Sequence, residues 1–455
     1  MEFKHELHLA KITPSDEPLR PFELLRTVIK NPMQIWPAAI YREPLVRWRV
    51  FGREMIFVMA PELIHEVLVH QADAFIKGEL VRRALTPVLG EAIFTSDGPH
   101  WRWQRRAAAP IFRQEAVSGF VSAMVNSAKR TKNRWLSCPP RTELNISHET
   151  MRTTFDVILE TMLSGHPNID ITRFEEAITR YLESIGWVTA MALLRFPPWM
   201  PFPGYLRARQ AGNYLKTVIS DVVMRCRRRQ GYASDLATRL MAATDPESGQ
   251  SMNDRELADN LLTFIVAGHE TTAVALTWAF YLLSLHPQIE GRVIGEIASV
   301  TGGQDVRPEQ IDALTYTRQV FLEAMRLYPP APILARTPVS DVRLGTELIP
   351  KDTPVYIPIY AIHRHTALWD HPDRFDPDRF GHDAVRARHR YTYIPFGAGP
   401  RICIGMSFAL TEAVAILATL LQSVRLRLRP DYVPELKMRA TLRPAAGMPM
   451  LVERR

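Results

Sequence analysis

The order of hydrophobic and polar positions divides the chain into segments with two different periods. Residues 45–60 (LVRWRVFGREMIFVMA) alternate apolar and polar side chains, which predicts a β-hairpin that turns at residues 51–53. Residues 61–70 predict a short helix. From 101 to 284 the apolar positions mostly recur with the helical period, whereas residues 332–395 alternate and are broken by glycine and proline.

Residues 251–285 form the longest helical candidate. Asn253 is placed to cap its first turn, and Glu256 follows at the spacing of a capping box. His286-Pro287 ends it, because the residue before a proline is driven out of the helical conformation. At up to ~30 residues this helix would be roughly 45 Å long, enough to cross a whole domain.

Two further helices are predicted at residues 318–328 and 407–424. The chain is therefore expected to be mainly α with small β-sheets (α+β), in a single domain of residues 1–455. The β-rich part is expected at approximately 40–70 and 332–395, and the helical body at approximately 71–330 and 396–425.

Composition adds that the protein is an ordinary globular one. Of 455 residues, 46% are hydrophobic and 23% charged, which argues against disorder. The net charge of +8 is a mild excess that favours an acidic protein partner or ordinary solubility over nucleic acid. A signal peptide is not evident, and no stretch reaches 18 uninterrupted apolar residues. These observations predict a soluble, cytoplasmic protein without a transmembrane segment.

Three cysteines, Cys138, Cys226 and Cys403, are too few for a disulfide framework. Only Cys403 lies in a segment with chemical character, FGAGPRICIG at residues 396–405. Amides at a helix start and a nearby arginine favour a thiolate, and glycines let the backbone approach something flat. An inert cysteine in a glycine-rich loop is the alternative. The supporting residues are Phe396, Gly397, Gly399, Arg401 and Gly405.

This segment resembles the haem-binding loop of cytochrome P450 enzymes, F-x-x-G-x-R-x-C-x-G. The five fixed positions of that pattern are matched by Phe396, Gly399, Arg401, Cys403 and Gly405. The resemblance implies that haem b (iron protoporphyrin IX) is bound with the Cys403 thiolate as axial ligand, which favours O–O cleavage.

Two more segments resemble the structural core of that family. Glu323 and Arg326 form an E-x-x-R pair on one helix face. Arg379 in FDPDRF would complete a structural triad, with Asp378 in place of the family's usual glutamate. An earlier PDRF offers Arg374 for the same place, so both assignments stay open at this stage.

The long predicted helix carries AGHETT at residues 267–272, which is similar to the family's oxygen-activating motif. Ala267 and Gly268 are small enough for a ligand to lie against the helix. Glu270 and Thr271 would deliver protons, but adjacent residues do not face each other on a regular helix. A relay through both therefore needs a local distortion or a water. His269 stands at the variable position and is not assigned a function.

Four residues match the family's contacts to the haem propionates. Trp101 and Arg105 are one helical turn apart, Arg336 matches a third position, and His100 is a weaker candidate. Arg102 and Arg106 are expected on a solvated face.

Residues 186–205 (GWVTAMALLRFPPWMPFPGY) are apolar, aromatic and rich in proline. The resemblance makes this segment the lid of the substrate pocket and suggests an apolar substrate. A loop packed on the body is an almost equal alternative, and a peripheral membrane contact is a weaker one. Further pocket candidates are Phe75, Ile76, Val266, Ala267, Ile333, Leu334 and Met448.

Electrons are expected from a separate protein. About 45 residues follow the cysteine loop, too few for a reductase domain, so a ferredoxin or flavodoxin with its reductase would pass on electrons from NAD(P)H. A monomer is favoured. The basic run before the cysteine loop, a hypothetical docking site for an acidic ferredoxin, consists of Arg386, Arg388, His389 and Arg390.

The sequence thus predicts a haem-thiolate monooxygenase that uses O2 to hydroxylate an apolar small molecule. A peroxide-using or rearranging haem-thiolate enzyme is the closest alternative, and the Glu270–Thr271 pair argues against it. A non-enzymatic haem sensor is a second alternative. A basic nucleic-acid binder is a third, which no motif supports.

Overall fold

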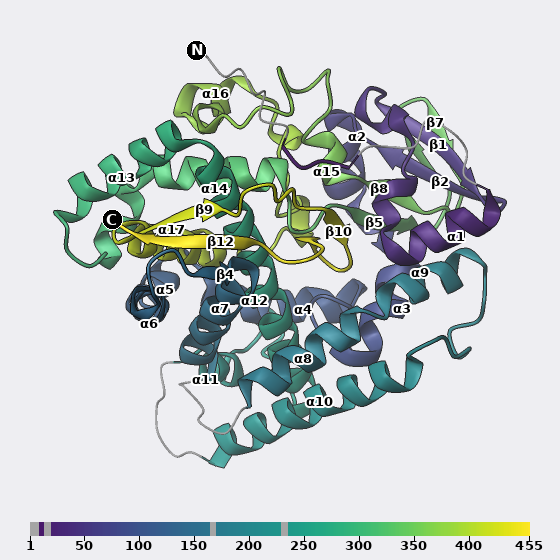
Figure 1. Ribbon diagram of the computed structural model, residues 1–455. Coiled ribbons are helices and arrows are strands. Elements are labelled where there is room, and N and C mark those ends of the chain that lie inside the picture. The colour runs from purple at the N-terminus through teal and green to yellow at the C-terminus, as the bar shows by residue number, and fades with distance from the viewer. Residues whose placement is uncertain (1–8, 13–19, 164–169, 229–234) are drawn as a thin grey trace.

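The structure is a computed structural model that describes residues 9–12, 20–163, 170–228 and 235–455. Helices make up most of it, and the strands form small sheets (Figure 1). The predicted fold class, mainly α with small β-sheets, is confirmed. The α-helices are α1 (Pro21–Lys30), α2 (Pro61–His65), α3 (Glu79–Leu89), α4 (Gly98–Ala108), α5 (Gln114–Ser118), α6 (Val121–Ser137), α7 (Ile146–Leu163), α8 (Ile171–Leu182), α9 (Ile185–Leu193), α10 (Tyr205–Arg228), α11 (Leu236–Ala242), α12 (Asp254–Leu285), α13 (Pro287–Thr301), α14 (Thr315–Leu327), α15 (Ile359–Ile362), α16 (His382–Ala387) and α17 (Met406–Leu421).

The strands form one sheet of five strands and three smaller sheets. The orders are β1-β2-β8-β5-β3, β4-β12-β9, β10-β11 and β6-β7. In Figure 1 the five-stranded sheet lies with α1 and α2 at the right, and the helical body lies to the left and below. The strands are β1 (Leu45–Val50), β2 (Arg53–Val58), β3 (Phe75–Lys77), β4 (Glu143–Asn145), β5 (Leu334–Pro338), β6 (Val342–Leu344), β7 (Glu347–Ile349), β8 (Val355–Ile357), β9 (Val424–Leu428), β10 (Leu436–Met438), β11 (Leu442–Pro444) and β12 (Pro449–Arg454).

The predicted hairpin at 45–60 is confirmed as the antiparallel pair β1–β2. Its turn places Phe51 and Gly52 at φ values of 47° and 71°. Two consecutive residues at positive φ form the tight turn whose twist matches that of the strands. The short helix after it is also confirmed, since α2 continues as a π-helical segment over Glu66–His70.

α12 crosses the helical body and confirms the longest predicted helix (Figure 1). The Asn253 side chain accepts the amides of Arg255 and Glu256, and Glu256 accepts the amide of Asn253 at 3.0 Å. His286 caps the other end, and α13 begins directly at Pro287. Among the described residues α12 alone is long and apolar enough to span a membrane, but 78% of its apolar window is buried inside the fold. It is therefore a core helix.

The extent of the β-structure differs from the prediction in two places. β3 and β4 interrupt the region expected to be helical, and β9 to β12 follow the last predicted helix. Most of these strands are only three residues long. Such short strands leave too few positions for an alternating pattern to show in the sequence.

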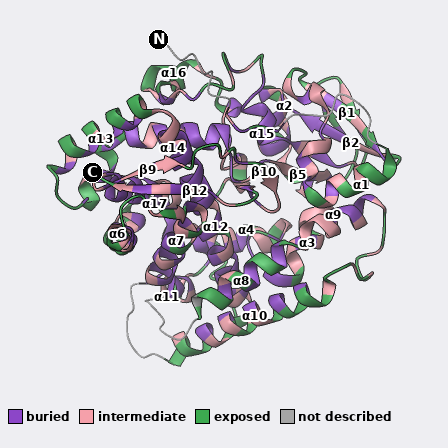
Figure 2. Ribbon diagram, in the orientation of Figure 1, coloured by how far each residue is buried: buried purple, intermediate pink, exposed green. Residues whose placement is uncertain are grey.

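A continuous hydrophobic core runs through the fold, from Ala10 to Val452. Figure 2 shows buried residues concentrated along α7, α12 and α17, with exposed residues on the outer faces of α1, α10, α13 and α16. α7 and α17 both pack against α12, so the cysteine loop before α17 and the AGHETT segment of α12 are attached to the same core.

Candidate active site

Cys403 lies in a closed loop directly before α17. The Cys403 amide donates to the Phe396 carbonyl at 2.9 Å, and the Ile402 amide donates to the Gly399 carbonyl at 3.0 Å. Gly399 has a φ of 70°, and a Cβ there would lie 1.9 Å from the Leu68 carbonyl oxygen. Only glycine fits this position, because the Cβ of any other residue would collide with the Leu68 backbone.

The Cys403 side chain is solvent-accessible, although many protein atoms surround its sulfur. Burial raises the pKa of the thiol, and the Gly405 amide and the Arg105 charge lower it. The sulfur therefore faces a space inside the fold, with a helix-start amide directed at it. Within the described residues no three His, Cys, Asp or Glu side chains are grouped to hold a bare metal ion. A metal at Cys403 would have to bring its other ligands with it.

Three cations gather beside this loop around one carboxylate. Lys77 of β3 and Arg336 of β5 are directly paired across the two strands. Arg401 donates to Asp97 Oδ1 at 2.5 Å and to the Ser96 carbonyl at 3.0 Å. Burial and the neighbouring arginines lower the pKa of Lys77 well below its usual range. Burial and Arg401 lower the pKa of Arg336 to about 10.

This cluster has more positive charge than its protein partners balance. Within the described residues the Arg336 guanidinium donates one hydrogen bond, to the Ala335 carbonyl at 2.9 Å. Like charges directly opposite each other on paired strands are destabilising, and buried charges are expected to be paired. The arrangement fits an acidic ligand with two carboxylates, such as the propionates of a haem. Together with the open Cys403 sulfur, these residues fit that cofactor.

The other residues expected at the propionates lie on α4 and differ in their contacts. The Arg401 guanidinium stacks on Trp101 at 4.2 Å, and Arg105 is close enough for its charge to act on Cys403. His100 instead contacts Trp103 and Gln104. Its contacts lie away from the cation cluster, so the structure does not support its assignment there.

Arg106, expected on a solvated face, is only partly solvated, with its side chain 32% exposed and paired with a buried acid. Arg106 Nε and Nη2 donate to the two oxygens of buried Asp245 at 2.7 and 2.8 Å. Hydrogen bonds from Arg106 and Ser248 hold the pKa of Asp245 well below its usual range. Arg102 is exposed as expected, with Asp73 at 3.6 Å.

One face of α12 is open where the rest of the helix is buried. Ala267 is exposed and Gly268 and Thr271 are partly exposed, whereas His269 and Glu270 are buried. The Thr271 hydroxyl donates to the Ala267 carbonyl at 2.7 Å. α12 is helical without interruption through this point, so the expected local distortion is not a break in the helix.

Glu270 turns away from Thr271. Its carboxylate accepts a hydrogen bond from the Thr441 hydroxyl at 2.6 Å and forms an ion pair with Arg443. Both partners come from the β10–β11 hairpin and its turn. The side chain of Glu270 is only 4% exposed, so this is a buried ion pair. In the structure the two proposed relay residues therefore face different parts of the protein.

A second acid beside α12 is not apparent from the sequence. Glu412 of α17 is fully buried, and among the described residues neither of its carboxyl oxygens has a well-formed hydrogen bond. Burial raises the pKa of Glu412 well above its usual range, and the Thr272 hydroxyl is the opposing influence. Burial therefore favours the neutral form of Glu412, which lies next to the helix that carries Glu270 and Thr271.

The structure brings the three residues of the predicted triad together and distinguishes between the two candidates for its third member, Arg379 and Arg374. Arg326 pairs with Glu323 through two hydrogen bonds of 2.6 and 2.8 Å, and both side chains are fully buried. Arg379 Nε lies 3.7 Å from Glu323 Oε1. Arg374 contributes only its carbonyl, which accepts Arg326 Nη2 at 2.9 Å. The geometry favours Arg379 as the third member.

The substrate-pocket candidates fall into two groups. Five of them have accessible surface or lie near the cysteine loop, namely Ile76, Val266, Ala267, Ile333 and Leu334. Phe75 and Met448 are 4% and 0% exposed and belong to the hydrophobic core. A side chain without free surface does not line a pocket, so the structure does not support these two.

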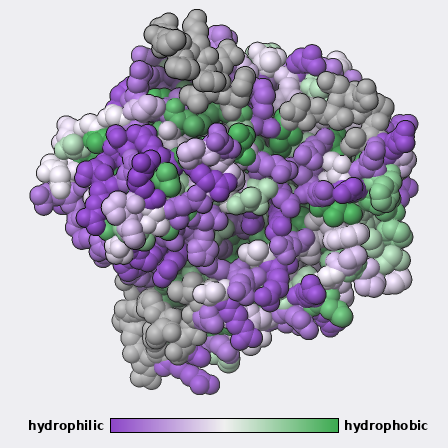
Figure 3. Space-filling view, in the orientation of Figure 1, coloured by the Kyte–Doolittle hydropathy of each residue, from purple (hydrophilic) through white to green (hydrophobic). Residues whose placement is uncertain are grey.

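The predicted lid has a packed base and an exposed tip. α9 packs against α1 and α3, and a Cβ on Gly186 would lie 2.3 Å from the Ile29 carbonyl oxygen. The loop after α9 is tied down where Arg83 donates to the Phe196 carbonyl at 2.8 Å, whereas Trp199 is 75% exposed. Figure 3 shows apolar surface along the right-hand edge, where Figure 1 places α1 and this loop.

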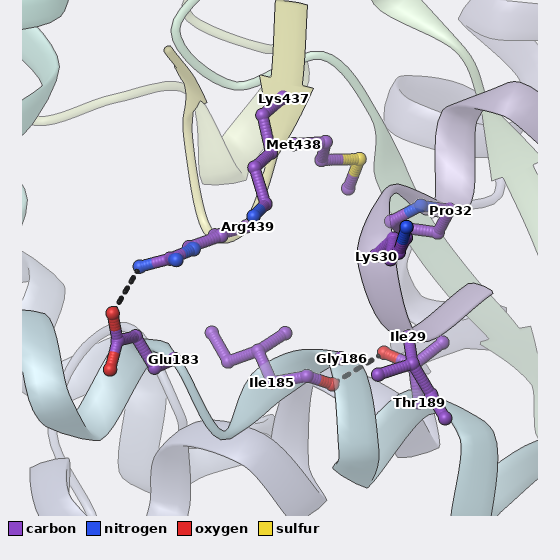
Figure 4. A pocket seen from close by; sticks show the side chains of 10 residues that line it. All are labelled: Ile29, Lys30, Pro32, Glu183, Ile185, Gly186, Thr189, Lys437, Met438 and Arg439. Carbon is purple, nitrogen blue, oxygen red and sulfur yellow. Dashed lines mark hydrogen bonds and ion pairs between the residues drawn. The ribbon is translucent and has the colours of Figure 1, made fainter. Parts of the chain in front are cut away.

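A hollow lies between α1, α9 and the β10–β11 hairpin (Figure 4). Ile29 and Lys30 line it from α1, Ile185 and Gly186 from α9, and Met438 from the hairpin. Most of its lining is polar, which distinguishes it from the apolar pocket expected for the substrate.

The basic run before the cysteine loop is not uniform. Arg386 and Arg390 are exposed. Arg388 donates to the Arg379 carbonyl at 3.1 Å and stacks on Trp369 and Phe380 at 4.5 and 4.9 Å. Arg388 is thus half-buried against these rings, and the expectation that it binds a partner is not supported.

The cysteine loop, the cation cluster and the open face of α12 define a site for a haem with a thiolate ligand. The family profile for Cytochrome P450 matches residues 33–450, and the chain belongs to this family. The predicted family and the enzyme class, a P450 monooxygenase, are confirmed at this level.

Relatives and a solved structure agree over almost the whole chain. Cyclooctatin synthase of Streptomyces melanosporofaciens is 32% identical over 94% of this chain and 91% of the relative. Pentalenene oxygenase of Streptomyces avermitilis is 30% identical, with 89% of each protein covered. The crystal structure of the cytochrome P450DA heme domain superimposes with a TM-score of 0.85, 26% identity and 98% coverage of both chains.

Five residues of the site were missed in the sequence, and four of them carried no local signal. Lys77, Asp97 and Arg443 become neighbours of the site only through strand pairing and loop packing. Thr441 and Glu412 lie in segments of ordinary composition. Asp97 alone had a local cue, because an acidic residue before Gly98-Pro99 is a helix N-cap candidate.

Proposed function

We propose that this protein is a haem-thiolate monooxygenase that hydroxylates an apolar small molecule with O2 and electrons from a separate redox protein. The observation that carries the proposal is the open Cys403 sulfur with the Gly405 amide directed at it, beside a cluster of three cations opposed by the single carboxylate of Asp97. Cys403 would hold the haem iron, and Lys77, Arg336 and Arg401 would hold the propionates. When bound, the haem supplies the oxidation of a C–H bond.

The protein residues supply binding and protons. Ala267 and Gly268 leave room beside α12, because neither has a side chain larger than a methyl group. The Thr271 hydroxyl, bonded to the Ala267 carbonyl, would hold a proton at Oγ1 on the open face of the helix. After its carboxylate leaves Arg443 and takes up a proton from solvent, Glu270 would pass that proton through a water to Thr271. The Glu323–Arg326–Arg379 triad is proposed as structural.

The substrate is proposed to be an apolar terpenoid hydrocarbon or alcohol. The names of three relatives support this substrate class, namely cyclooctatin synthase, cyclooctat-9-en-7-ol 5-monooxygenase and pentalenene oxygenase. The apolar lid at 186–205 and the aliphatic side chains of Ile333 and Leu334 support it.

The redox partner is proposed to be an acidic ferredoxin, with a flavodoxin as the alternative, reduced by an NAD(P)H-dependent reductase in the cytoplasm. Exposed Arg386 and Arg390 support a docking contact on the side of the cysteine loop. Reversal of charge at Arg386 is expected to lower the rate of reduction and its dependence on salt.

A single spectroscopic experiment tests the central assignment. The reduced protein with carbon monoxide should show the red-shifted Soret band of a thiolate-ligated haem, and Cys403→Ser should abolish it. Cys138→Ser, a change at a cysteine whose sulfur lies 3.4 Å from the Arg134 carbonyl, is the matched control and should leave the band unchanged. A band that survives Cys403→Ser would contradict the proposal.

Binding of pentalenene and related hydrocarbons, followed by the spectral shift of the haem, tests the substrate class. Saturable shifts with terpenes but not with hydrophilic sugars support it. A peroxide-using enzyme would instead convert a bound compound with peroxide alone and show no dependence on Thr271→Ala.

A further inference from the structure

The β10–β11 hairpin presents three polar side chains in alternate positions. Its strands pair Leu436 with Pro444 and Met438 with Leu442, and the turn is closed by the Arg439 amide bonded to the Thr441 carbonyl at 3.1 Å. Arg439 and Thr441 lie in the turn, and Arg443 is the middle residue of β11.

Two of these side chains hold the proposed proton donor. Thr441 donates to Glu270 at 2.6 Å, and Arg443 pairs with the same carboxylate oxygen. The side chains of Glu270 and Arg443 are 4% and 18% exposed. Removal of one member of such a buried pair leaves the other charge without a partner, so the pair fixes the Glu270 carboxylate firmly.

The third side chain reaches the segment that leads into the lid. Arg439 Nη1 donates to Glu183 Oε1 at 3.0 Å across the hollow that separates the hairpin from α9 (Figure 4). Glu183 caps the end of α8, two residues before α9 begins. The two side chains are 24% and 51% exposed, so the contact is weak and readily broken.

The base of the hairpin is fixed to helices on both sides. Trp278 of α12 donates through Nε1 to the Leu442 carbonyl at 2.9 Å. Asn31, which caps α1, donates to the Leu436 carbonyl at 2.7 Å and accepts the Met438 amide at 3.2 Å. The Leu442 amide also donates to the Pro330 carbonyl at 3.0 Å. The free part of the hairpin is therefore its turn, residues 439–441, which carries Arg439 and Thr441, whereas Arg443 lies beyond the anchored Leu442.

We propose that the β10–β11 hairpin couples closure of the lid to the position of the Glu270 carboxylate. Arg443 and Thr441 act as positioning residues for Glu270. Arg439 keeps its hydrogen bond to Glu183 only while Glu183 and α9 are in place. The inference rests on the proposed function, because it gives Glu270 the role of proton donor. Movement of α9 that breaks the Glu183 contact frees the turn, and the hold of Thr441 on Glu270 then changes with it.

A double-mutant cycle tests the coupling without any measurement of activity. Glu183→Gln, Thr441→Val and the double variant, each with haem bound, are compared by urea unfolding in 0.3 M salt, which screens direct attraction. Within the described residues Glu183 and Thr441 share no hydrogen bond, and changes at independent sites add. The proposal predicts that the effects on the unfolding equilibrium constant differ from additive by threefold or more. Glu183→Gln combined with Arg455→Gln, which removes a partner of buried Glu290, is the control pair and should be additive.

A solvent isotope effect tests the positioning role. With a surrogate ferredoxin, its reductase and pentalenene as the probe compound, Arg443→Gln should at least double the deuterium solvent isotope effect on NADPH oxidation and raise the peroxide fraction. Glu183→Gln should shift both in the same direction. Arg443→Lys should restore most of the wild-type values, which a loss of folding alone would not allow. Lys437→Gln, at the position paired with Arg443 on the hairpin, is the matched control and should change neither.

The outcomes separate this inference from the proposed function. If the Cys403-dependent band is present but the cycle is additive and the isotope effects match wild type, the coupling is overturned and the enzyme assignment stands. If the band is absent from the wild type, the proposed function fails, and the unfolding cycle still decides whether the hairpin links Glu183 to Glu270. A non-additive cycle together with a raised isotope effect supports the inference.

Discussion

Lys77 and Arg336 face each other across the paired strands β3 and β5, although both carry positive side chains. Burial is the largest factor that lowers the pKa of each group, and the Arg401 charge adds to it. Asp97 is the carboxylate that opposes them. Arg336 is buried and Lys77 is partly buried, and two such like charges on neighbouring strands lower the stability of the fold unless an anion binds between them.

The Lys77–Arg336 pair gives a prediction with opposite signs for folding and for haem retention. Lys77→Met removes a partly buried cation that lacks a full partner, so the haem-free protein should gain about 1–3 kcal/mol in free energy of unfolding. The same change removes one charged contact to a haem propionate, so transfer of haem to apomyoglobin should be roughly tenfold faster. Lys351→Met, at an exposed position, is the control and should alter neither value. A destabilised haem-free protein would contradict the interpretation.

The close approach at Gly399 gives a second prediction. Alanine there meets both a φ of 70° and the Leu68 carbonyl oxygen at 1.9 Å. Gly303 has a similar φ of 76° but nothing within 4 Å of its hypothetical Cβ. Gly303→Ala should therefore cost only the backbone strain of about 1–2 kcal/mol. Gly399→Ala should cost about 1–3 kcal/mol more, because the clash displaces the cysteine loop. Urea unfolding compares the two, and equal costs would contradict the steric explanation.

The buried triad gives a third prediction. Glu323→Gln leaves Arg326 buried without its counter-charge and should lower the free energy of unfolding by about 3–5 kcal/mol. Asp378→Asn removes the partner of Arg292 in an exposed ion pair and should cost less than about 1 kcal/mol. Thermal or urea unfolding of the two variants distinguishes the buried pair from the exposed one.

The same measurement decides between the two arginines. Arg379→Gln should be clearly more destabilising than Arg374→Gln, because Arg379 approaches Glu323 with its side chain and Arg374 contributes only a carbonyl. The reverse order would assign the third place to Arg374.

What could be predicted from the sequence was encoded in neighbouring residues. The capping box of Asn253 and Glu256 and the loop around Cys403 depend on contacts within a few positions, so spacing alone revealed them. The ion pair of Glu270 with Arg443 joins residues 173 positions apart and depends on how the last hairpin packs on α12. The pairing of Lys77 with Arg336 needs strand β3, which is three residues long and has no detectable period.

The same limit explains the expectations that the structure changes. Arg106 looked solvated because its helix is rich in charge, and nothing near it in the sequence announces the buried carboxylate of Asp245. Arg388 looked like part of an exposed basic run, but Trp369 and Phe380 fold back to cover it. Local composition does not distinguish a charged side chain that contacts distant residues from one that is fully solvated.

Glu175 gives a prediction for the dependence of stability on pH. Burial, together with the charge of Asp156 on α7, raises the pKa of Glu175 from 4.5 to about 7, and Arg152 opposes the shift. A carboxyl whose pKa is raised in the folded state adds stability below its unfolded pKa and loses it as the pH rises through the folded pKa. The wild type should therefore lose stability between about pH 4.5 and pH 7, by up to about 3 kcal/mol.

Glu175→Gln should unfold like the wild type near pH 4.5 and be more stable at pH 8. Glu176→Gln is the matched control, because that exposed neighbour pairs with Arg180 and should leave the pH profile unchanged. If Glu175→Gln is no more stable than the wild type at pH 8 in urea unfolding, Glu175 is not held neutral by the fold.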